Sequence, residues 1–184
     1  MLRIALSACI CTSLGLTLSH AQQSAQFTSL KEIRERGVVM QKWETSCAAA
    51  TLATVLTYGF KDGVTERYVA ARMLEKSTAA TIKKQGGFSL LDMKHFVEER
   101  GYIGLGYRDL SLSDLKAFHA PIVPIVNYGF NHYVVINGIQ DDEVLLADPA
   151  FGNRKMHVDQ FNEVWVQGIA FVVTATEKND KNRY

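Results

Sequence analysis

Cys47 is the side chain of this sequence with the clearest potential for covalent chemistry. It opens an alanine-rich segment directly after Thr45 and Ser46, either of which could cap a helix, so we expect Cys47 in the first helical turn. Unpaired backbone N–H groups and the positive end of the helix dipole in that turn stabilise a thiolate and can also bind a developing oxyanion. A free cysteine is more commonly a small apolar core residue, but this position favours a nucleophile.

A thiolate nucleophile needs a base, and His132 is the best candidate. The chain has 5 histidines, and His132 is the one that begins a predicted β-strand. Asp148 ends another predicted strand and could accept the second imidazole N–H, which would fix the tautomer and stabilise the imidazolium. An ordinary turn before Pro149 explains this aspartate equally well. Gln41, a short distance before Cys47, could donate a side-chain N–H to an oxyanion hole or could be a surface amide.

Mainly helical patterns fill the sequence from about residue 29 to 120. Ser29, Ser89 and Ser111 each stand three residues before an acidic residue, which is the spacing of a capping box. Between them, residues 46–58 carry apolar side chains at helical spacing and many alanines, which predicts a buried, closely packed helix.

After Pro121 the sequence changes to β-branched runs separated by Gly, Asn and Asp. The predicted strands are residues 122–128, 133–139, 144–147 and 169–175, with a short helix at 159–165. Helices followed by largely antiparallel strands predict an α+β fold.

The N-terminus has the composition of a secretory signal peptide. Arg3 precedes an apolar and small-residue run, Ile4–Leu18, and Ala21 offers a cleavage point, so we expect residues 1–21 to be removed. The run is too short for a spanning helix of about 20 residues, so stable membrane insertion is not expected. An alternative is a lipoprotein cleavage box ending at Cys9, which would anchor the protein through lipid, but the apolar run before Cys9 is short for that purpose.

Cleavage after Ala21 changes the meaning of the cysteines. It removes Cys9 and Cys11 and leaves Cys47 as the only thiol, so no intrachain disulfide can form. A single cysteine in an exported chain suggests intermolecular pairing or a thiol kept for chemistry. This count therefore favours the interpretation of Cys47 as a reactive thiol.

Composition limits the partners and cofactors that can be expected. Lys and Arg number 20 against 19 Asp and Glu, so neither nucleic acid nor an anionic membrane surface is indicated as a partner. No cofactor motif is present, and a metal site at His132 and Asp148 would lack a local ligand cluster. We expect one domain at residues 29–176, a flexible segment at 22–28 and a disordered polar tail at 177–184.

Three segments that contain the candidate site, Gln41–Thr54, His132–Gly138 and Asp148–Gly152, resemble the C39 peptidase family of papain-like cysteine peptidases. The intervening segments Gly87–Lys94, Pro121–Pro124 and Phe161–Trp165 also resemble that family and follow in the same order. The resemblance covers roughly residues 29–175. Within the family, the sequence resembles the stand-alone periplasmic C39-like proteins of bacterial Fap functional-amyloid systems.

The resemblance implies a role for each candidate residue. Cys47 would be the nucleophile, His132 the general base and then acid, and Asp148 the orienting carboxylate, while Gln41 and the Cys47 backbone N–H would form the oxyanion hole. The fold would be papain-like, with a helical N-terminal half packed on an antiparallel sheet and the active site between them. The activity would be that of a periplasmic cysteine endopeptidase whose substrates are exported proteins or peptides, such as components of amyloid secretion.

Two features depart from the family pattern. Ala48 follows the nucleophile where many members have glycine, and Trp43 stands close to the site, where it is expected to wall a substrate subsite. A second function remains open, a C39-like module that binds a secretion substrate without cutting it. Degenerate modules of that kind lack the nucleophile, whereas Cys47, His132 and Asp148 are all present here.

Overall fold

Serine capping boxes begin three of the helices where the sequence predicts them. The structure, a computed structural model, describes residues 28–127 and 129–176, so the predicted signal peptide and polar tail lie outside the described residues. Ser29, Ser89 and Ser111 each accept the N–H of the third helical residue, whose carboxylate accepts the serine N–H in return. The helices are α1 (Leu30–Glu35), α2 (Cys47–Thr54), α3 (Glu66–Leu74), α4 (Ala79–Gln85), α5 (Leu90–Glu99), α6 (Leu112–Leu115) and α7 (Val158–Val164).

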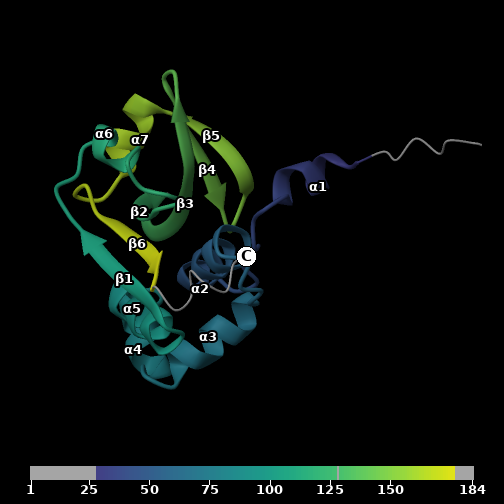
Figure 1. Cartoon of the computed structure of the whole chain (residues 1–184), viewed down its shortest axis with the longest axis vertical. Coiled ribbons are helices and arrows are strands. Elements are labelled where there is room, and N and C mark those ends of the chain that lie inside the picture. The colour runs from purple at the N-terminus through teal and green to yellow at the C-terminus, as the bar shows by residue number, and fades with distance from the viewer. Residues whose placement is uncertain (1–27, 128, 177–184) are drawn as a thin grey trace, which may run out of the picture.

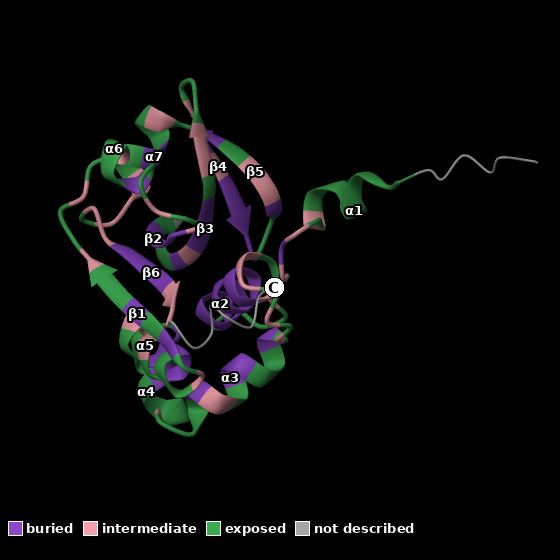
Figure 2. Ribbon diagram, viewed as in Figure 1, coloured by how far each residue is buried: buried purple, intermediate pink, exposed green. Residues whose placement is uncertain are grey.

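Helix α2 lies at the centre of the molecule, between helices α3 and α5 and the sheet (Figure 1). All of its residues are buried, as Figure 2 shows. Its alanines allow neighbouring elements to approach closely, because a methyl side chain adds little to the helix radius. The predicted helix over residues 46–58 is confirmed, although its last part is a π-helical turn, η1 (Val55–Gly59).

Within the described residues the strands form one antiparallel sheet in the order β1-β6-β2-β3-β4-β5. The strands are β1 (Tyr102–Tyr107), β2 (Ile122–Asn127), β3 (Phe130–Gln140), β4 (Glu143–Asp148), β5 (Gly152–His157) and β6 (Ala170–Ala175). Four of them correspond to the predicted strands. The two edge strands, β1 and β5, were not predicted from the sequence.

The two unpredicted strands have physical reasons to escape detection. Gly104 and Gly106 interrupt β1, and glycine lowers strand propensity. Gly104 is required because an added Cβ would lie 2.8 Å from both Phe171 and Val97, where β1 packs between β6 and α5. Strand β5 is polar and lies at the edge of the sheet, so it lacks the apolar alternation that marks a half-buried strand.

The core has two parts, one on each face of the sheet. Val135 belongs to the cluster that joins the sheet to α2, α3 and α5, whereas its neighbours Val134 and Ile136 belong to the cluster covered by α6 and α7. This division follows from the alternation of side chains along a strand. The α+β prediction is therefore confirmed. Among the described residues, no helix combines the length and apolarity needed to cross a bilayer.

Candidate active site

Cys47 is the first residue of α2, as predicted, and its side chain is buried. The N–H of a first helical residue has no intrahelical acceptor. Ser46 occupies the N-cap position, but its side chain makes no capping hydrogen bond, contrary to the expectation that it could cap. Its hydroxyl donates instead to Glu66 Oε1 and to Trp43 O, the latter at 2.8 Å. The backbone donors of the first turn are therefore left without a side-chain acceptor from the N-cap residue.

His132 and Asp148 meet across β3 and β4. His132 Nε2 lies 2.8 Å from Asp148 Oδ1, and the side chains are 11% and 0% exposed. Because Nε2 is held by the carboxylate, Nδ1 is the nitrogen available to the thiol of Cys47. The structure therefore brings together the three residues that the sequence analysis named as nucleophile, base and orienting carboxylate.

The charge state of His132 depends on its two partners. Burial lowers its pKa, but the hydrogen bond and charge of Asp148, together with those of a Cys47 thiolate, outweigh burial and raise the pKa to about 9. The imidazole is therefore an imidazolium at neutral pH. A group in this state can donate a proton to a leaving amine.

Both carboxylate oxygens of Asp148 accept hydrogen bonds. Burial would raise its pKa, but the hydrogen bond and charge of His132, the N–H of Ala150 and the guanidinium of Arg154 outweigh burial and hold the pKa below its ordinary value. The Ala150 N–H reaches Oδ1 at 2.9 Å, and Arg154 Nε reaches Oδ2 at 2.8 Å. The carboxylate is thus fixed in both charge and direction.

Gln41 lies next to the turn that follows Asp148, because the Gln41 N–H donates to Pro149 O at 2.8 Å. Its side-chain Nε2 donates to Trp43 O at 3.2 Å, and its Oε1 is buried with no partner among the described residues. Nε2 carries a second hydrogen, which is available to another acceptor. The predicted oxyanion role of Gln41 remains a prediction.

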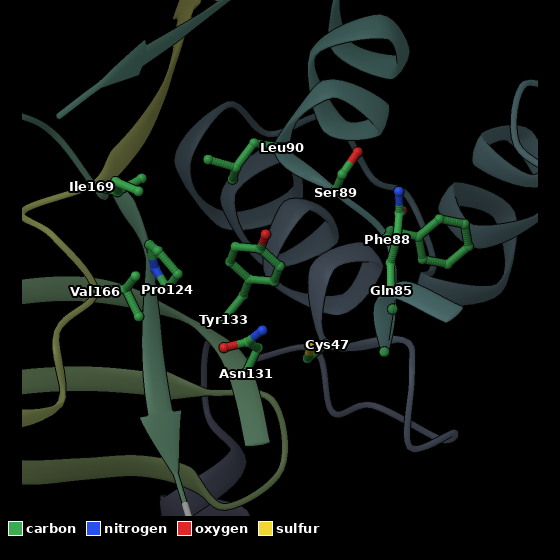
Figure 3. Close-up of a pocket in the computed structure, with 12 residues that line it drawn as sticks. Cys47, Gln85, Phe88, Ser89, Leu90, Pro124, Asn131, Tyr133, Val166 and Ile169 are labelled. Carbon is green, nitrogen blue, oxygen red and sulfur yellow. The ribbon is translucent and has the colours of Figure 1, made fainter. Parts of the chain in front are cut away.

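A cavity of about 330 Å³ reaches Cys47 between the helices and the sheet. In Figure 3 the side chains of Gln85, Phe88 and Ser89 face those of Pro124, Val166 and Ile169, with Tyr133 between them. These lining residues come from the end of α4, the α4–α5 connection, β2, β3 and the loop before β6. The cavity can hold a polypeptide segment beside the thiol.

Tyr133 follows His132 on β3 and had not been singled out from the sequence. Burial raises the pKa of Tyr133 to about 12, and the negative charges of Cys47 and Asp92 act in the same direction. Its hydroxyl therefore stays protonated at neutral pH and can donate a hydrogen bond inside the cavity. Its position directly after a candidate base was the only signal that could have identified it.

Trp43 is half exposed and does not line the cavity at Cys47. It lines a neighbouring, largely apolar cavity of about 570 Å³ with Arg67, Leu74 and Lys83. Phe88 borders both cavities. A subsite walled by Trp43 would therefore lie beside the cavity of the nucleophile rather than inside it.

Within the described residues, no group of three or more His, Cys, Asp or Glu side chains is arranged to hold a metal ion. The expectation that His132 and Asp148 do not form a metal site stays a prediction.

The model of the peptidase C39 family matches residues 35–178. A "probable functional amyloid protease FapD" of Pseudomonas aeruginosa is 34% identical over 149 residues, which cover 80% of this chain and 65% of that protein. A protein of the same name from Pseudomonas fluorescens is 36% identical over 151 residues, covering 80% of this chain and 66% of that protein. The chain thus spans slightly less than two thirds of the length of these relatives.

Solved structures with the same fold include peptidase domains of transporters. A double glycine motif protease from an AMS/PCAT transporter, solved in complex with the leader peptide, has a TM-score of 0.62 and 27% identity, and the match covers 76% of this chain and 91% of that chain. The peptidase domain of Streptococcus ComA has a TM-score of 0.63 and 22% identity and covers 76% of this chain and 98% of that chain. At 22% identity, the likeness to the ComA domain supports a shared fold and nothing about activity.

Proposed function

Because the chain belongs to the peptidase C39 family, we propose that it is a cysteine endopeptidase that acts on exported proteins. The family resemblance drawn from the sequence is confirmed by the family match and by the two FapD relatives. The observation that carries the proposed activity is the position of Cys47 at the start of α2, with the imidazole of His132 held beside it by Asp148. The catalytic triad would be Cys47, His132 and Asp148.

The proposed reaction has two steps. In the reactive ion pair the proton of the Cys47 thiol already resides on His132 Nδ1, and the thiolate sulfur attacks a backbone carbonyl carbon of the substrate. The Cys47 N–H and the second Nε2 hydrogen of Gln41 would stabilise the resulting oxyanion. The imidazolium then protonates the leaving amine, which leaves a thioester on Cys47 and a neutral imidazole. Water, deprotonated by the neutral His132, hydrolyses the thioester, and release of the thiolate restores the Cys47–His132 ion pair.

The proposed substrates are protein components of a functional-amyloid secretion system, and the proposed location is the periplasm. The name of the Pseudomonas relatives supports the substrate class, and the signal-peptide composition of residues 1–21 supports export. Fractionation of cells that express the full chain tests the location. We expect a periplasmic protein that begins at Gln22, and a cytoplasmic protein that begins at Met1 would contradict the proposal.

The test of activity uses the full chain, exported and processed by a bacterial host. The purified product is incubated with the other exported proteins encoded beside its gene, and new termini are identified by mass spectrometry. We expect defined cleavage sites that disappear in Cys47→Ala, with a loss of at least about 10³-fold in rate. His132→Ala should cost a similar factor.

Two results would contradict this function. Absence of new termini with every such protein would argue against peptidase activity on this substrate class. Cleavage at the same sites by Cys47→Ala would show that the thiol is not the nucleophile. Circular dichroism of the variants provides the control that they remain folded.

A further inference from the structure

Glu66 is a buried carboxylate beside the site that the proposed mechanism does not use. It is the first residue of α3 and is 2% exposed. Its Oε1 accepts the Lys42 N–H at 2.8 Å and the Ser46 hydroxyl. Its Oε2 is buried with no hydrogen-bond partner among the described residues. An unpaired buried oxygen is costly, so a reason for retaining this glutamate is required.

The two donors to Glu66 lie at the two ends of one loop, residues 42–46. Lys42 follows Gln41, and Ser46 precedes Cys47. A single carboxylate oxygen therefore ties together the neighbours of both oxyanion donors of the proposed mechanism. The separation of those donors determines whether they can converge on one oxygen atom.

The same loop is held internally and from a second side. Trp43 O accepts the N–H of Ser46 at 3.2 Å and Nε2 of Gln41 at 3.2 Å. On the cavity side Gly87 packs against the loop, where an added Cβ would lie 3.2 Å from Thr45 O. Glu66 thus fixes the two ends of the loop, while the hydrogen bonds to Trp43 O and the packing of Gly87 hold its middle.

The charge of Glu66 does not explain its presence. A negative charge near an oxyanion hole opposes the development of negative charge on the substrate oxygen. The contribution of Glu66 must then come from its geometry as an acceptor rather than from its charge. The start of α3 offsets part of the cost of the buried carboxylate, because helix N-termini favour anions.

We propose that Glu66 is a positioning residue that sets the spacing between the Gln41 amide and the Cys47 N–H, and so shapes the oxyanion hole. This inference rests on the proposed function. It predicts that loss of the Glu66 acceptor impairs oxyanion binding and kcat while the Cys47 thiol itself stays reactive.

The first test separates oxyanion binding from thiol reactivity. A peptide aldehyde that carries the residues preceding a cleavage site mapped with the wild-type chain forms a hemithioacetal whose oxygen would occupy the oxyanion hole, whereas iodoacetamide alkylates the thiol without using it. We expect Glu66→Ala to weaken inhibition by the aldehyde at least about 10-fold and to change the alkylation rate of Cys47 less than about threefold. Equal aldehyde affinity in Glu66→Ala and wild type would overturn the inference.

The second test uses a peptide that spans a cleavage site mapped with the wild-type chain. Glu66→Ala should lower kcat by roughly 10- to 100-fold with KM changed less than about threefold. Glu66→Gln keeps an acceptor oxygen without the charge, and it should recover most of the lost kcat. If Glu66→Gln is as impaired as Glu66→Ala, the charge matters rather than the acceptor, and the inference is wrong.

Two further variants guard against a simple folding defect. Ser46→Ala removes one of the two hydrogen bonds to Glu66, together with the bond of the hydroxyl to Trp43 O, and it leaves the Lys42 N–H bond to Glu66 in place. It should therefore lower kcat by a smaller factor than Glu66→Ala. Ser77→Ala is a matched control, because it removes a hydroxyl bond to another buried carboxylate, Asp92, outside this loop. It should leave kcat unchanged.

A wild-type chain that neither cleaves nor binds the aldehyde would refute the proposed function itself, whereas an active wild type with an equally active Glu66→Ala refutes this inference alone.

Discussion

Replacement of Asp148 by asparagine should lower the pH at which the enzyme loses activity. In the proposed mechanism His132 must be protonated to release the leaving amine. Its pKa is raised from 6.5 to about 9, so activity in the wild-type chain should fall as the pH rises through about 9. The asparagine side chain would keep the shape of the aspartate and an acceptor for Nε2, but it would remove the charge that favours the imidazolium.

The size of the effect follows from the difference between the two pKa values. A rise from 6.5 to about 9 corresponds to roughly 3 kcal/mol in favour of the imidazolium, net of a burial effect that opposes it. The hydrogen bond with Asp148 contributes more than the one with Cys47. Loss of the carboxylate charge should therefore lower the pKa of His132 by at least about one unit and reduce activity at about pH 8 by about twofold or more.

The assay measures kcat/KM as a function of pH with the mapped substrate peptide, beside an NMR titration of the His132 ring in a Cys47→Ala background. Arg154→Gln is the control, because it removes the partner of the other carboxylate oxygen and leaves the His132–Asp148 bond in place. We expect the alkaline midpoint to fall in Asp148→Asn and not in Arg154→Gln. An unchanged midpoint in Asp148→Asn would refute the reasoning that Asp148 keeps His132 protonated.

Further predictions concern stability and can be checked by urea denaturation. Because the folded-state pKa of His132 is raised to about 9, protonation contributes stability that is fully present below about pH 6.5 and is lost as the pH rises through about 9. The stability of His132→Gln should not decline in this way as the pH rises. The same pH dependence of stability in His132→Gln and in the wild type would contradict the prediction. Gly152→Ala should destabilise the fold by about 2 kcal/mol or more, because Gly152 has φ +78° and an added Cβ would lie 2.6 Å from Arg34 O. Phe161→Ala, on the buried face of α7, should cost about 3–5 kcal/mol of stability without changing kcat of the folded protein, and a cost below about 1 kcal/mol would contradict its packing role.

Local signals predicted much of the fold and the placement of the candidate triad. The serine capping boxes identified the starts of α1, α5 and α6, because both partners of a capping box lie within one helical turn. The alanine-rich periodicity identified α2 and placed Cys47 at its start. His132 and Asp148 were predicted at the ends of strands, and antiparallel pairing of β3 with β4 brings them together.

The features that escaped prediction depend on contacts between distant segments. Glu66 meets the loop before α2 only through tertiary packing, and nothing in its own sequence context marks it. Arg154 lies in a polar edge strand whose register with β4 alone brings it to Asp148. The Ser46 hydroxyl was expected to be a possible cap, but it donates to the charged carboxylate of Glu66 and to the backbone oxygen of Trp43.

The most direct test of the account is whether the substrate becomes covalently attached to Cys47 during cleavage. The full chain is mixed with the mapped peptide, quenched in acid within a single turnover, and analysed by intact mass and peptide mapping. We predict a thioester between Cys47 and the N-terminal product fragment, formed at least as fast as product and absent in Cys47→Ala. Product formation at the wild-type rate with no adduct on Cys47 would contradict the account.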